Sequence, residues 1–183
     1  MQEKRIEKHR VFFGQTGIDG AELLAVLRPQ IGRRQHARQK HFNAVGVRLG
    51  YNRIEIAFGL ARLQAAAALV KAGNTDEAIA VYDRLATDRA VDRILRDLGA
   101  LLAALHRFDA ADNAEMLQRL APLVLDSNAW RYSAREMQAL VMHRSGDVVQ
   151  ARALLEALVD DAEAPGGIRS RAAELLGVIG GEG

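Results

Sequence analysis

The sequence predicts an all-α protein, a right-handed solenoid of about three helical hairpins closed by a C-terminal capping helix. Three observations carry this prediction. Alanine, the strongest helix former, occurs 28 times in residues 56–183 but only 4 times in residues 1–55. Residues able to cap a helix stand three positions before Glu or Gln at Asn74, Asp112 and Asp147. The intervals between these caps, 112 − 74 = 38 and 147 − 112 = 35, are typical of helical-hairpin repeats.

The first and third hairpins are expected to share one arrangement. The first pairs a helix near residues 56–72 with one near 75–87, and the third pairs 129–144 with 148–161. A glycine stands between the helices in each case, because a helix commonly closes with one residue in the left-handed conformation. These glycines are Gly73 and Gly146.

The second hairpin and the final helix complete the stack. Helices near residues 91–106 and 113–124 form the second hairpin, and Pro122 is expected to kink or end its second helix. The last helix, near 166–178, begins after Pro165, a residue suited to a first turn. Its apolar residues recur at helical spacing and would cover the open end of the stack: Ile168, Ala172, Leu175, Leu176 and Ile179.

Charge divides the chain near residue 55. Residues 1–55 hold 11 Lys and Arg against 5 Asp and Glu, a balance of 11 − 5 = +6. Residues 56–183 hold 14 against 18, a balance of 14 − 18 = −4. We therefore predict a basic N-terminal segment, residues 1–55, and a helical repeat domain, residues 56–183. The segment's first residues lack the apolar stretch of a secretory signal, and no run is long enough to cross a membrane.

The sequence does not favour enzymatic chemistry. It contains no cysteine, which excludes thiolate zinc sites and cysteine nucleophiles. The glycines of residues 14–20 lack the spacing of a nucleotide-binding loop, and the serines lack a nucleophile-elbow motif. His36 and His41 are five positions apart, which is unsuited to two metal ligands on one helix face. We therefore predict a protein that is not an enzyme and that uses no cofactor and no metal.

The first and third hairpins resemble tetratricopeptide repeats. Small residues stand where the two helices must approach closely, in Ala65-Ala66-x-x-Leu69-x-x-x-Gly73-x-x-x-x-Ala78-x-x-x-Tyr82 and in Ala139-x-x-Met142-x-x-x-Gly146-x-x-x-x-Ala151-x-x-x-Leu155. The middle hairpin departs from the pattern because its turn has no glycine. The resemblance implies a tetratricopeptide-like solenoid that binds proteins.

A second resemblance covers residues 57–179. It is carried by Leu95-Arg96-Asp97-Leu98, by Asn128-Ala129-Trp130-Arg131 and by Ala164-Pro165-Gly166-Gly167-Ile168-Arg169. These segments are similar to the ancillary subunit family of the bacterial Sec translocon. The resemblance implies a protein-interaction module at the periplasmic face of the inner membrane, with the translocon or periplasmic chaperones as partners. Where that family has its membrane helix, this chain has the basic run of residues 33–41, so a cytoplasmic location is the alternative.

The basic segment supplies an alternative function. Six cations cluster within one short stretch, and such clustering attracts phosphate groups: Arg28, Arg33, Arg34, Arg38, Lys40 and Arg48. Residues 1–53 would then bind nucleic acid or an anionic membrane. Aromatic residues for base stacking are few, so nucleic acid is not the expected partner. A third possibility is self-association through an exposed repeat face.

The inner surface of such a solenoid is lined by the first helix of each hairpin. If it holds a peptide or a partner helix, side chains of the first and third hairpins should form the groove. We predict an apolar end and a mixed-charge end, made by Leu63, Ala67, Val70, Lys71, Glu136, Leu140, His143 and Arg144. The alternative for the leucines is burial between repeats or under the N-terminal segment. Trp130, the sole tryptophan, is expected to pack against the preceding hairpin.

Overall fold

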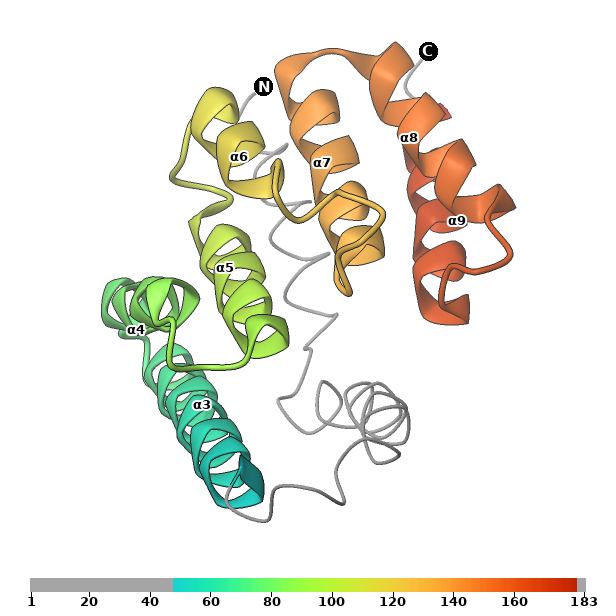
Figure 1. The fold of residues 1–183 in the computed structure, drawn as a ribbon. Coiled ribbons are helices and arrows are strands. Elements are labelled where there is room, and N and C mark those ends of the chain that lie inside the picture. The colour runs from blue at the N-terminus through green and yellow to red at the C-terminus, as the bar shows by residue number, and fades with distance from the viewer. Residues whose placement is uncertain (1–47, 181–183) are drawn as a thin grey trace.

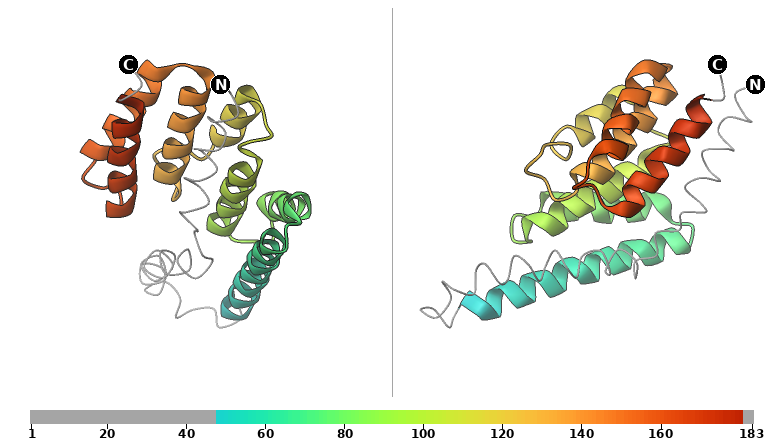
Figure 2. Two further views of the ribbon diagram at one scale, coloured as in Figure 1. Left: turned by 180° about the vertical axis from the view of Figure 1, so that it is seen from behind. Right: turned by 90° about the vertical axis from the view of Figure 1, so that its right-hand side faces the viewer.

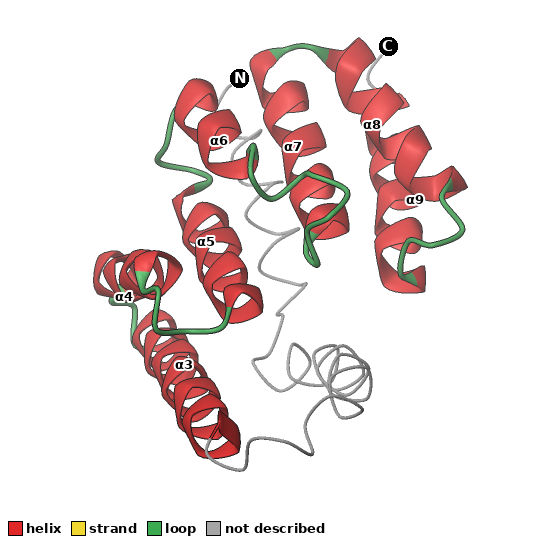
Figure 3. Ribbon diagram, viewed as in Figure 1, coloured by secondary structure: helices red, strands yellow, loops and turns green. Residues whose placement is uncertain are grey.

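A computed structural model describes residues 48–180. Within that range every regular element is an α-helix, and Figure 3 shows no strand there. The predicted all-α class is therefore confirmed for this part of the chain. Seven helices follow one another: α3 (Arg48–Lys71), α4 (Thr75–Thr87), α5 (Arg93–Arg107), α6 (Asn113–Leu120), α7 (Arg131–Ser145), α8 (Val148–Asp160) and α9 (Gly166–Gly180).

Two helix bounds differ from the sequence prediction. The helix α3 begins at Arg48, well before the expected start near residue 56. The helix α6 ends at Leu120, before the expected end near residue 124. Pro122 follows closely and lacks the amide N–H that another helical turn needs, so the chain leaves the helix in a series of turns.

Most of the predicted helix signals have the expected local structure. Asp112 Oδ1 accepts a hydrogen bond of 2.7 Å from the Glu115 amide, and Asp147 Oδ1 accepts one of 3.0 Å from the Gln150 amide. The first amides of a helix have no carbonyl partner within the helix, and these side-chain oxygens supply one. Asn74 stands at the predicted cap position of α4, but its side chain makes no capping hydrogen bond. Its backbone amide donates to Leu69 O in the preceding turn.

The glycine prediction is confirmed at both turns. Gly73 has φ +83° and Gly146 has φ +89°, and they are the positive-φ residues of the described range. The amide of each glycine donates a hydrogen bond of 3.0 Å to the carbonyl three positions earlier. The next amide donates to the carbonyl five positions earlier, over 2.9 Å at the first turn and 3.0 Å at the second. The two helix ends therefore have the same hydrogen-bonded structure.

A shift of 146 − 73 = 73 positions along the chain, called the repeat shift below, places Gly73 on Gly146 and relates the first hairpin to the third. Helices α4 and α8 begin and end at equivalent positions. Ala66 and Ala78, where α3 and α4 meet, are fully buried, and so are their equivalents Ala139 and Ala151. Small side chains at these four positions let each helix pair pack closely. The described range thus contains one supersecondary unit twice, with α5 and α9 following it at equivalent positions.

The helices follow one another in a bent row with α3 at one end and α8 and α9 at the other (Figures 1 and 2). One large apolar cluster contains residues of all five helices from α5 to α9, among them Leu98, Met137 and Leu155. Two smaller clusters fix α3 and α4 to α5, around Tyr82 and around Leu95. The helix α5 therefore links the first hairpin to the rest of the core. None of the helices in residues 48–180 is long and apolar enough to cross a membrane.

Candidate functional site

The eight residues predicted to line a groove form four equivalent pairs under the repeat shift. The members on α3 are Leu63, Ala67, Val70 and Lys71, and those on α7 are Glu136, Leu140, His143 and Arg144. They thus occupy the same positions in the two copies of the repeated unit. The contacts of the two sets differ, and they are described in turn.

On α7, three of the four side chains are buried. Glu136 is 8% exposed, Leu140 2% and His143 5%. Arg171 of α9 reaches the Glu136 carboxylate with Nε on Oε1 and Nη2 on Oε2, each at 2.8 Å. This two-point contact raises the pKa of Arg171, since the bound carboxylate stabilises the charged guanidinium. The pair fixes α9 against α7.

Arg144 connects the end of α7 to the turn between α5 and α6. Its Nε donates to Asn113 Oδ1 over 2.7 Å, and its Nη1 donates to the carbonyl of Phe108. Its guanidinium carbon also lies 4.5 Å from the centre of the Phe108 ring, a cation–π contact. Burial lowers the pKa of Arg144, while Asp109 and Asp112 nearby favour its charged form. Arg144 therefore closes the junction between the second and third hairpins.

On α3, the equivalent positions are more open. Leu63 is half-buried and packs against all three apolar clusters, while Val70 packs against the cluster around Tyr82. Ala67 is half-buried and Lys71 is exposed. The predicted groove residues thus lie largely at contacts between successive helices, and Lys71 is the exposed member of the set. A role for these eight residues in binding a partner stays a prediction.

Trp130 packs against the preceding hairpin, as predicted. Its indole Nε1 donates 2.9 Å to Ile94 O in the first turn of α5, and the residue is 9% exposed. Asn128 supports this contact from within the loop, because its Oδ1 accepts from the Trp130 amide at 2.8 Å. The Asn128 Nδ2 donates to Asp97 Oδ2 and to Pro122 O. One buried amide thus ties the loop between α6 and α7 to α5.

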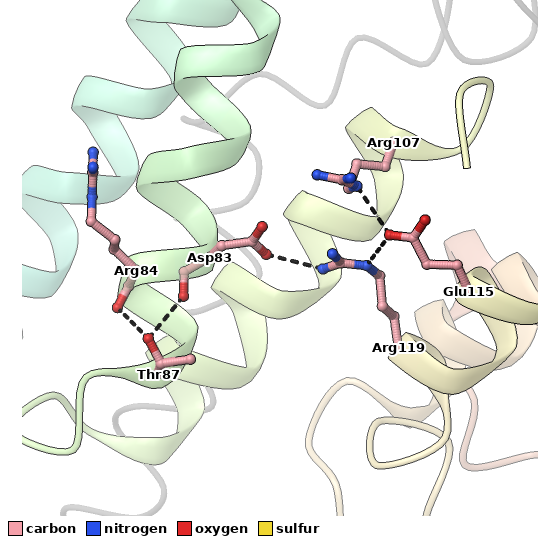
Figure 4. Close-up of polar contacts among 6 residues, drawn as sticks. All are labelled: Asp83, Arg84, Thr87, Arg107, Glu115 and Arg119. Carbon is pink, nitrogen blue, oxygen red and sulfur yellow. Dashed lines mark hydrogen bonds and ion pairs between the residues drawn. The ribbon is translucent and has the colours of Figure 1, made fainter. Parts of the chain in front are cut away.

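A network of charged side chains joins α4, α5 and α6 (Figure 4). Arg119 on α6 donates a hydrogen bond of 3.1 Å to the Asp83 carboxylate on α4. It donates another of 2.9 Å to the carboxylate of Glu115, one turn earlier on α6. Arg107 at the end of α5 lies 3.3 Å from the same Glu115 carboxylate. Sequence reasoning did not find this network, because Asp83 and Arg119 are far apart in the chain and no local pattern relates them.

A stacked ring pair lies between α4 and α5. The rings of Tyr82 and His106 are 5.7 Å apart between centroids and nearly parallel, with an interplanar angle of 4°. Burial raises the pKa of Tyr82 and lowers the pKa of His106, since a low-dielectric surrounding disfavours the charged form of each. The pair therefore contributes packing in its neutral state.

The described residues contain no group of three or more His, Cys, Asp or Glu able to hold a metal ion. The charged side chains described above connect neighbouring helices to one another. Residues 1–47, which make up most of the basic segment and of the proposed arm 1–53, lie outside the described residues. The run of residues 33–41 and the glycines of residues 14–20 belong to this part. No family model, no curated protein and no solved structure matches this chain significantly.

Proposed function

We propose that this chain is a non-enzymatic protein-interaction module built as a tetratricopeptide-like solenoid. The observation that carries the proposal is the repeated unit, in which the same turn, the same buried alanines and the same following helix occur twice under one shift. Repeated helical hairpins present an extended surface made of many short helices, which suits recognition of a peptide or a partner helix. The resemblance to the ancillary Sec translocon subunit supports the class of partner proposed below.

The distribution of charged groups supports a binding role. Arginines of α6, α7 and α9 are engaged with acidic groups or carbonyls of neighbouring helices. These contacts organise the stack and leave the outer faces of the helices to set the specificity of binding. The proposed location is the bacterial envelope, at the periplasmic face of the inner membrane. The proposed partners are translocon subunits or periplasmic chaperones.

Affinity capture with the tagged full-length chain tests this function. The chain is incubated with detergent-solubilised inner membranes and periplasmic extract after nuclease treatment, and bound proteins are quantified by mass spectrometry. We expect translocon subunits or periplasmic chaperones to be enriched over the tagged resin alone, in low and in high salt. Binding that disappears with nuclease or falls steeply with salt would instead support the basic segment as the binding element.

A further inference from the structure

We draw no further inference here: the strongest candidate, the surface patch of exposed valines at the start of α8 (Val148 and Val149) and near the end of α9 (Val178), is an unpartnered apolar face, and nothing in the described part of the structure shows what covers it.

Discussion

Arg171 binds Glu136 at the place that Leu98 and Leu63 occupy in the first copy of the repeated unit. The repeat shift relates both pairs, since 136 − 73 = 63 and 171 − 73 = 98. Leu98 lies in the large core cluster with Leu63 packed against that cluster. A two-point ion pair therefore stands where the first copy has two leucines of the apolar core.

Removing one partner of this pair should destabilise the protein. Glu136→Ala and Arg171→Ala each leave a charge without its partner in a largely buried place. Because the Arg171 side chain remains 32% exposed, we expect a loss of about 2 kcal/mol in the free energy of unfolding, less than for a fully buried pair. Urea denaturation followed by circular dichroism measures it.

The double variant Glu136→Leu/Arg171→Leu provides the control for this prediction. It installs the apolar pair of the first copy, and we expect its stability to lie within about 1 kcal/mol of the unmodified chain. If the single variants were as stable as the unmodified chain, the pair would have no part in holding α9.

The amide of Asn128 should also be important for stability. It is 2% exposed and contacts the Asp97 carboxylate, the Pro122 carbonyl and the Trp130 amide. Asn128→Ala removes these three contacts and leaves the buried Trp130 amide without its acceptor, so we expect a loss of about 2 kcal/mol on urea denaturation. The neighbouring Ser127 is exposed, and Ser127→Ala should change stability by less than about 0.5 kcal/mol. Equal behaviour of the two variants would show that the loop does not depend on Asn128.

Gly146 and Gly177 offer a matched test of backbone conformation. A Cβ atom would meet nothing within 4 Å at either position, so steric contact with other residues does not distinguish them. Gly146 has φ +89°, and Gly146→Ala should cost about 1 kcal/mol through backbone strain. Gly177 lies inside α9, and Gly177→Ala should raise the free energy of unfolding by about 0.5–1 kcal/mol. A stabilising Gly146→Ala would contradict the left-handed turn.

His106 should make stability depend on pH. Burial lowers the pKa of His106 below its usual value of 6.5, which we take for the unfolded chain. Between the folded pKa and 6.5 the unfolded chain binds more protons. The free energy of unfolding is therefore highest above 6.5 and falls as the pH falls through that window.

The variant His106→Phe isolates this effect because it keeps a ring beside Tyr82 and removes the titrating group. We expect its melting temperature to change less between neutral and mildly acidic pH than that of the unmodified chain. Asp88 does not interfere, since its hydrogen bond from Arg62 holds the pKa of its carboxyl below 3.8, outside this window. Parallel pH profiles for the two proteins would contradict the assignment to His106.

Local sequence rules predicted the helices well because their causes are local. Asp112 and Asp147 cap helices through atoms three positions away, and Gly73 and Gly146 adopt a conformation that their own lack of a side chain favours. Asn74 shows the limit of such rules. Its backbone angles, φ −87° and ψ 58°, are close to those of Asp147, φ −80° and ψ 70°, yet only the aspartate side chain caps its helix.

The surroundings of the groove residues could not be predicted in the same way. Glu136 suggested a mixed-charge surface, but its partner Arg171 lies much later in the chain, on another helix. Arg144 likewise meets Phe108 and Asn113 across a junction between hairpins. Such contacts depend on how the helices pack.

The most direct test of the proposed function compares what the tagged full-length chain and the tagged resin alone capture from solubilised inner membranes and periplasmic extract. The account predicts that translocon subunits or periplasmic chaperones are enriched after nuclease treatment and in high salt. Capture of neither class of protein by the unmodified chain, with nuclease-sensitive binding of nucleic acid in its place, would contradict the account.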